Sequence, residues 1–308
     1  MAVVLITGGT GLLGRALTGA LLARGYGCII LTRQQRSGED GIRYATWDPR
    51  NNTIDEKAVQ EADYIIHLAG AGIAEKRWTR KRKQEILNSR VHSGKLLAGS
   101  LRRIPNKVKA VISASATGWY GADPEGRGGK PFSEEDPAGT GFLADTCRQW
   151  EECMEPVTVL NKRLVVFRIG IVLSKKGGAL KEFLKPLRFG VAAFPGSGRQ
   201  MTSWIHIDDL ASMFLYAIEN TGIKGVYNAV APQPVSNRGL IHTLAKMKNR
   251  FFIPLHIPAW LLKLIMGEMG PEILKSVTVS SEKIDRAGFC FRYPDIHSAL
   301  AGELTQAR

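Results

Sequence analysis

A glycine-rich stretch near the N-terminus constrains the fold more than any other part of the sequence. Residues 3–6, Val-Val-Leu-Ile, form a short apolar run, which is typical of a parallel strand buried on both faces. Glycines follow at Gly8, Gly9, Gly11 and Gly14, and from residue 13 the apolar residues recur with helical spacing until residue 25, a glycine. The stretch therefore predicts a strand, a glycine turn and the start of a helix.

This predicted geometry suits the pyrophosphate of a dinucleotide. Glycines let the backbone approach phosphate groups closely, and the free N–H groups and dipole of a helix N-terminus attract an anion. A tight structural turn is the alternative explanation, but the strand before the glycines and the helix after them favour nucleotide binding. We expect the pyrophosphate to contact five residues: Gly8, Thr10, Gly11, Leu12 and Leu13.

The second predicted strand, residues 28–32, ends in a basic segment. Sites that prefer NAD place an acidic residue here for the ribose 2′-hydroxyl, whereas an arginine suits the 2′-phosphate of NADP. This chain has Thr32 and Arg33 at that point, Arg36 close behind, and no acidic residue before Glu39. Two guanidinium groups match a phosphate dianion, although arginines exposed after a strand are the alternative. The sequence therefore predicts NADP(H) as the cofactor.

Length, apolar content and cysteine spacing narrow the class of protein. The 308 residues can bury a dinucleotide-binding domain together with a smaller lobe. No apolar run is long enough to span a bilayer, and the N-terminus is a strand rather than a signal peptide, so we expect a cytoplasmic protein. The four cysteines have neither disulfide nor metal-site spacing, and we expect no metal.

The net charge of +14 raises the question of a polyanionic partner. The densest basic run, residues 76–83, lies at the start of a helix predicted over 79–101, and no nucleic-acid recognition motif accompanies it. A solvated helix face explains the run, so we expect neither a nucleic-acid nor a membrane partner. Cations within residues 174–199 fit an anionic small-molecule substrate, with solvated lysines as the alternative. The oligomeric state stays open between monomer and homodimer.

The motifs together resemble a known family. The spacing G-x-x-G-x-x-G after Ile-Thr resembles the short-chain dehydrogenase/reductase superfamily, in particular its extended, epimerase-like branch. Residues 46–49, 71–79 and 88–91, with the tail, resemble an atypical subgroup that carries a C-terminal domain of unknown function. Members of this subgroup are labelled nucleotide-sugar epimerases or cell-division inhibitors. The resemblance implies an α/β fold: a doubly wound parallel Rossmann sheet with a smaller, discontinuous C-terminal substrate lobe.

The resemblance also divides the chain. It implies an NADP(H)-binding domain over residues 1–173 and 204–230, and a substrate lobe over 174–203 and 231–308. The cofactor would also contact residues on the fourth, fifth and sixth predicted strands (residues 63–70, 109–113 and 163–173): Leu68, Ala69, Gly70, Ser113 and Arg168. Residues 225–229 are predicted as the last strand of the sheet. We interpret His67, Asp208 and Asp209 as structural. The apolar run 257–266 is interpreted as core packing, with a substrate pocket or a subunit contact as alternatives.

The catalytic residues of the family are matched only in part. Extended relatives carry Ser-Ser-x-x-Val-Tyr-Gly where this chain has residues 114–121, so Ser115 is the matching hydroxyl and Thr117 the alternative. A Tyr-x-x-x-Lys dyad should follow, in which the lysine lowers the pKa of the tyrosine. Counting back from Glu151 puts Leu143 and Cys147 at these positions, and the neighbouring register gives Phe142 and Thr146. Neither register supplies the dyad.

Tyr120, Asp145 and Lys162 are the candidate substitutes, and we select Tyr120 with Ser115 as the catalytic pair. The resemblance then implies an NADP(H)-binding, epimerase-like oxidoreductase that acts on a small polar substrate such as a nucleotide-sugar. The alternative is a non-catalytic protein that binds or senses NADPH and has lost the Tyr-x-x-x-Lys dyad.

Overall fold

The computed structural model describes residues 1–38, 41–124, 129–248 and 251–305. Its centre is an eight-stranded sheet in the order β12-β7-β6-β5-β1-β2-β3-β4, parallel except for the antiparallel pair of β3 and β4. The sheet strands are β1 (Val3–Thr7), β2 (Gly27–Thr32), β3 (Ile42–Asp48), β4 (Thr53–Ile54), β5 (Tyr64–His67), β6 (Ala110–Ala116), β7 (Arg163–Ile169) and β12 (Gly225–Ala229).

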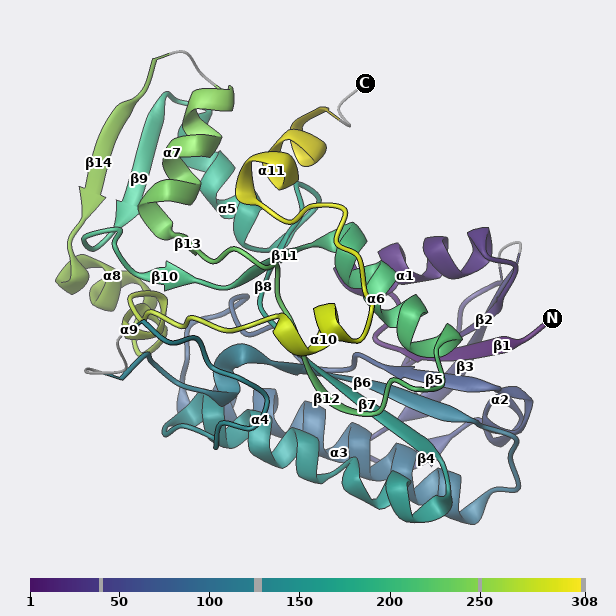
Figure 1. The fold of residues 1–308 in the computed structure, drawn as a ribbon. Coiled ribbons are helices and arrows are strands. Elements are labelled where there is room, and N and C mark those ends of the chain that lie inside the picture. The colour runs from purple at the N-terminus through teal and green to yellow at the C-terminus, as the bar shows by residue number, and fades with distance from the viewer. Residues whose placement is uncertain (39–40, 125–128, 249–250, 306–308) are drawn as a thin grey trace.

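Helices cover both faces of this sheet, with α1 and α6 on one face and α3 and α4 on the other (Figure 1). The helices of this part are α1 (Leu12–Ala23), α2 (Glu56–Glu61), α3 (Arg80–Arg103), α4 (Phe142–Glu152) and α6 (Ile207–Glu219), with 3-10 turns η1 (Thr117–Trp119) and η2 (Glu155–Leu160). Strands β1, β2 and β6 are almost continuously apolar and buried because helices cover them on both sides. The predicted doubly wound parallel sheet is confirmed.

The predicted strand over residues 163–173 is wrong in one respect, because it is two strands. β7 ends at Ile169, and β8 (Ile171–Leu173) leaves the main sheet to pair with β11 (Trp204–His206). Gly170 allows this change of direction, since a Cβ there would lie only 2.6 Å from the Ser203 carbonyl oxygen. Periodicity could not reveal the break, because the residues on both sides of Gly170 are apolar.

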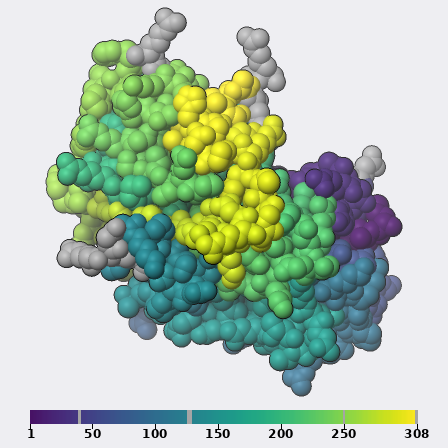
Figure 2. Space-filling model, in the orientation of Figure 1, coloured from purple at the N-terminus to yellow at the C-terminus, as the bar shows by residue number. Residues whose placement is uncertain are grey.

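A second lobe with its own core lies beside the main sheet, in the upper left part of Figure 2. It contains α5 (Gly178–Leu187), β9 (Val191–Pro195), β10 (Met201–Thr202), β13 (Val235–Ser236), α7 (Asn237–Lys248), β14 (Ile253–Ile257), α8 (Ala259–Met266), α9 (Met269–Ile273) and α11 (Ile296–Thr305). β9 pairs with β14 in parallel, and β10 with β13 antiparallel. Among the described residues, no helix is both long and apolar enough to cross a bilayer.

The tail connects the two parts of the molecule. Helix α10 (Glu282–Arg286) lies beside β12, and Ile284 and Phe289 belong to the core of the main sheet. The Asp209 carboxylate accepts hydrogen bonds from the backbone N–H groups of Arg292 and Tyr293, each at 2.9 Å. Asp209 therefore has a structural contact, as expected. The proposed boundary at residue 231 stays a prediction, although residues 284 and 289 pack on the first domain.

Candidate functional site

The glycine loop between β1 and α1 is tightly packed. Gly8 has a φ of +68°, and a Cβ there would lie 2.9 Å from the carbonyl group of Leu68. A Cβ on Gly14 would lie 2.5 Å from the Gly8 carbonyl oxygen, so α1 can begin close against the loop only with glycine at this position. Helix α1 starts at the N-cap Gly11, with no side-chain cap and no acidic residue in its first turn. These features fit an anion such as a pyrophosphate.

The basic segment after β2 lies at the same end of the sheet as the glycine loop, where the parallel strands have their carboxyl ends. β1 and β2 are parallel neighbours, so the glycine loop and Thr32 follow adjacent strand ends. Thr32 is buried, and its hydroxyl donates to the carbonyl oxygen of Gln34, which shapes the turn. Arg33 and Arg36 are exposed, and the Arg36 guanidinium lies 5.9 Å from the centre of the Tyr44 ring. The residues expected at the pyrophosphate and at the 2′-phosphate thus lie together at the carboxyl ends of β1 and β2.

The turn after β5 also lies at the carboxyl end of the sheet, on the other side of the glycine loop from β2. β5 is the other neighbour of β1, and the N–H groups of Leu68 and Ala69 each donate to the Thr7 hydroxyl at 3.1 Å. This hydroxyl is 2.8 Å from Nδ1 of His67, which is fully buried. His67 therefore holds the Thr7 hydroxyl that positions residues 68 and 69, in agreement with its expected structural role.

Burial, together with the nearby Arg90 charge, lowers the pKa of His67 to about 3. The unfolded chain binds a proton at this histidine near pH 6.5, whereas the folded protein does not, so folding stability must fall as the pH drops from about 6.5 towards 3. We expect this group to cost about 2 kcal/mol at pH 5 relative to pH 7.

Urea unfolding of the wild type and of His67→Gln at both pH values measures this cost, because the other titrating groups are common to the two proteins. The variant should lose less stability on acidification. An equal loss in both proteins would show that His67 protonates freely in the folded state.

Arg90 of α3 is a buried cation that the sequence analysis did not select. Its guanidinium donates to the carbonyl oxygens of Ala71 and Ile86, and a Cβ on Gly70 would lie 2.9 Å from its Cζ atom. It also lies 4.8 Å from the centre of the Trp150 ring. Burial lowers the pKa of Arg90 to about 10. Arg90 thus packs against the turn at residues 70–71 and holds it in place. In the sequence, only the family motif at residues 88–91 pointed to this arginine.

Ser115 lies at the end of β6 within a buried polar network. Its hydroxyl donates to Glu151 Oε1 at 2.6 Å, and only 2% of the residue is exposed. Glu151 accepts two further hydrogen bonds at 2.9 Å from the Arg168 guanidinium on β7. The structure therefore brings Ser115 and Arg168 together, as cross-strand partners that share one carboxylate.

Tyr120 belongs to the same network. Its hydroxyl donates to Asn228 Oδ1 at 2.6 Å and accepts from Arg168 at 3.1 Å, and the residue is 3% exposed. Burial raises the pKa of Tyr120 to about 12. The Arg168 guanidinium stacks on the Trp119 ring, with its Cζ atom 3.7 Å from the ring centre. Ser113 is also buried, and its hydroxyl donates to the Ala114 carbonyl oxygen. Ser113 and Arg168, which were expected to contact the cofactor, are therefore buried in the sheet rather than exposed at the carboxyl ends of its strands.

The two positions of the missing dyad lie next to the end of β6. A Cβ on Gly118 would be 3.2 Å from Leu143 Cβ and 3.6 Å from Cys147 Sγ. Cys147 is buried, and this burial raises the pKa of its thiol to about 11. Neither side chain can exchange a proton near neutral pH. Thr117, the alternative hydroxyl, is partly exposed beside them in η1.

An apolar cluster lies beyond the ends of β5 and β6. It joins the segment after β5 to the start of α4 and to α8 and α9, and its members are Ile73, Trp78, Ile86, Phe142, Leu143, Met266 and Met269. Trp78 and Phe142 meet edge to face at 5.0 Å between ring centres. Leu143, at the tyrosine position of the dyad, thus belongs to an apolar wall.

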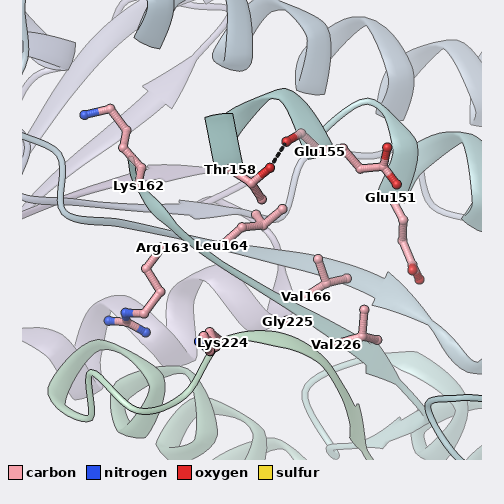
Figure 3. A pocket seen from close by; sticks show the side chains of 10 residues that line it. All are labelled: Glu151, Glu155, Thr158, Lys162, Arg163, Leu164, Val166, Lys224, Gly225 and Val226. Atoms are coloured by element: carbon pink, nitrogen blue, oxygen red, sulfur yellow. Dashed lines mark hydrogen bonds between the residues drawn. The ribbon is translucent and has the colours of Figure 1, made fainter. Parts of the chain in front are cut away.

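A groove of about 650 Å³ opens at the amino ends of the strands, at the opposite end of the sheet from the glycine loop (Figure 3). It is lined by Lys162 and Arg163 at the start of β7, Lys224 and Gly225 at the start of β12, and residues of η2. Ligands of open α/β sheets bind beyond the carboxyl ends of the strands, whereas this groove lies at their amino ends. Lys162 is thus remote from the candidate site, and its amine donates to the Val108 carbonyl oxygen.

The parallel sheet, the glycine loop and the helix that begins behind it define a dinucleotide-binding protein of the Rossmann class. The family model described as "NAD dependent epimerase/dehydratase family" matches residues 4–143, and that of a domain of unknown function (DUF1731) matches residues 257–302. An epimerase family protein of Bacillus subtilis, YfhF, is 36% identical over 97% of this chain and 96% of its own length. The chain belongs to the NAD dependent epimerase/dehydratase family.

Two solved structures place the fold in the same family. The human epimerase family protein SDR39U1, crystallised with NADPH, has a TM-score of 0.85 and 29% identity, over 98% of this chain and 99% of that chain. The nucleoside-diphosphate sugar epimerase of Corynebacterium glutamicum has a TM-score of 0.78 and 35% identity, over 98% of this chain and 58% of that chain. The predicted family resemblance is confirmed, including its C-terminal domain.

Proposed function

We propose that the protein is an NADP(H)-dependent, epimerase-like oxidoreductase that acts on a small-molecule substrate. The observation that carries the proposal is the basic end of β2, where Arg33 and Arg36 stand beside the glycine loop and no acidic residue precedes Glu39. The human relative that was crystallised with NADPH supports the same cofactor.

The chain's own residues would hold the cofactor at three points. The start of α1, with residues 8 and 10–13, would hold the pyrophosphate, and the two arginines would hold the 2′-phosphate. Residues 68–70 would lie along the ribose, held there by the Thr7 hydroxyl and by Arg90. NADP(H), when bound, supplies or accepts the hydride.

The source of the proton differs from that of the family. Leu143 and Cys147 cannot provide it, and the hydroxyls of Ser115 and Tyr120 are buried and already hydrogen-bonded. We therefore propose that Ser115 and Tyr120 take part as positioning residues, because they hold Glu151 and Arg168 behind the strand end. Thr117 in η1 is partly exposed, and we propose that its hydroxyl or a bound water donates the proton.

The substrate is proposed to bind beyond the ends of β5 and β6, between the two lobes. Cations of the second lobe, such as Lys176 and Arg199, favour an anionic group, in keeping with a nucleotide-sugar. The apolar wall at Phe142 and Leu143 would instead contact a less polar part of the substrate.

Turnover of NADPH with pooled nucleotide-sugars and carbonyl compounds tests the proposal, followed by absorbance loss and by deuteride incorporation. We expect Thr117→Val to lower kcat by about 10²-fold while KM and NADPH affinity stay the same, since general acid help is worth ~10²–10⁴. Ser115→Ala should lower stability and change the rate less. Equal rates for wild type and Thr117→Val would remove Thr117 from the mechanism.

A non-catalytic protein that binds or senses NADPH is the second candidate. The observation that favours it is the pair Leu143 and Cys147. An apolar side chain and a neutral buried thiol occupy the positions where the family has the tyrosine and lysine that transfer the proton. Tight NADPH binding without turnover of any substrate in the pools would select this function.

A further inference from the structure

The exposed apolar side chains of the protein are concentrated in one region of the second lobe. Ten large hydrophobic side chains are exposed in the part of the chain that the structure describes, and seven of them lie within residues 189–265. They are Phe189, Phe251, Ile253, Leu255, Trp260, Leu264 and Ile265, with exposed fractions between 53% and 85%. Such a concentration marks a contact surface, because single exposed apolar residues are normally scattered.

Strand pairing puts part of this set on one sheet face. Ala192 and Phe194 of β9 point into the core of the second lobe, so Val191 and Ala193 point outwards. Their register partners on β14 are Ile253 and Leu255, and these therefore share the outer face. Phe189 lies at the same end, because the Ile253 N–H donates to the Gly190 carbonyl oxygen.

Helix α8 continues this surface along the same flank of the molecule (Figure 1). Leu262 is buried, whereas Trp260, Leu264 and Ile265 are each more than 60% exposed. The interpretation of residues 257–266 as core packing is therefore wrong for most of α8. The apolar run predicted burial on all sides, but α9 and the segment around Trp78 cover only one side. We call β14 and α8 with Phe189 and Phe251 the β14–α8 face.

The charge around this face is predominantly positive. Residues 174–203 and 231–280 contain twelve lysines and arginines but only three acidic residues. Exposed cations stand directly beside the apolar side chains, with Arg188 next to Phe189 and Lys263 between Trp260 and Leu264. Lys248 ends helix α7 just before Phe251. The second lobe thus combines protruding apolar groups with a positive rim.

We propose that the β14–α8 face docks on an anionic lipid membrane as a peripheral surface. Exposed Trp, Phe, Ile and Leu side chains enter the headgroup region, while lysines and arginines attract anionic lipids. A second copy of the chain fits less well, because a two-fold contact would bring the two positively charged rims together and they would repel each other. Nucleic acid would use the cations but would leave the aliphatic side chains of β14 without a partner. This proposal replaces the expectation of no membrane partner.

Sedimentation of the full chain with lipid vesicles tests the proposal. We expect binding to vesicles of phosphatidylcholine with phosphatidylglycerol, at least about tenfold weaker binding to phosphatidylcholine alone, and loss of binding at high salt. The triple variant Phe251→Ser, Leu255→Ser and Trp260→Ser should bind anionic vesicles at least about tenfold less. Its side chains are exposed, so the melting temperature should stay close to that of the wild type.

Val159→Ser is the matched control, since Val159 is 80% exposed on η2 but lies outside the face. This control should bind vesicles like the wild type. Absence of binding to anionic vesicles, or equal binding by the triple variant and the wild type, would overturn the proposal. Sedimentation equilibrium provides a second check: a dimer that the triple variant abolishes would assign the face to a second copy instead.

Discussion

Replacing Arg168 by methionine should destabilise the protein by about 3–5 kcal/mol, because a buried ion pair would lose one partner. The Arg168 and Glu151 side chains are only 4% and 11% exposed, and two hydrogen bonds at 2.9 Å join them. The substitution would also remove the hydrogen bonds from Arg168 to Tyr120 and to the Glu134 carbonyl oxygen. Urea unfolding at pH 7 measures the loss.

Two further variants show whether the loss comes from the stranded charge. Arg148→Met is the control, because Arg148 on α4 is half exposed and its carboxylate partners lie at 3.4 Å, so its loss should cost no more than about 1 kcal/mol. Adding Glu151→Leu to Arg168→Met should restore part of the stability, since the carboxylate that Arg168→Met leaves without its cation would then be absent. If Arg168→Met costs no more than Arg148→Met, the network does not stabilise the fold.

The double variant Arg33→Asp, Arg36→Ala should bind NADPH about 100-fold more weakly than the wild type, whereas NADH binding should change only a few-fold. Each arginine would donate a charge-assisted hydrogen bond to the 2′-phosphate, which NADH lacks, and such bonds contribute about 1.5–3 kcal/mol. Titration calorimetry with both cofactors measures the four affinities.

Arg43→Ala is the control for a general change in charge. Arg43 is a half-exposed arginine of β3 in the same domain, paired with Glu61, and its loss should leave both affinities unchanged. Wild-type protein that binds NADH as tightly as NADPH would contradict the cofactor proposal. So would a double variant that keeps its preference for NADPH.

The dinucleotide part of the fold could be predicted because its signals are local. The apolar run at residues 3–6, the glycines and the helical spacing after Leu13 lie within about twenty residues, and the structure has β1, the loop and α1 there. The last strand of the sheet, residues 225–229, was likewise predicted with its observed bounds. These elements depend on neighbours in the sequence, so the sequence alone identifies them.

The catalytic side was less predictable because its contacts join distant parts of the chain. Glu151 served only to count positions along the predicted helix, yet it joins Ser115 to Arg168, which are 53 residues apart in the sequence. Whether a hydroxyl at a strand end faces solvent or the interior depends on such partners. The exposure of Trp260 was equally hidden, because an apolar run does not show which of its sides another element covers.

The position of β12 has a consequence for the order in which the protein forms during synthesis. β7 ends at Ile169 and pairs with β6 along one edge, but the strand that covers its other edge begins only at Gly225, after the chain has built α5, β9 and α6. Until the ribosome has released residues 225–229, the growing chain leaves that second edge of β7 uncovered, which is a template for aggregation. Ile284 and Phe289 close the same core later still. The first domain can thus be completed only after residue 289 has been synthesised.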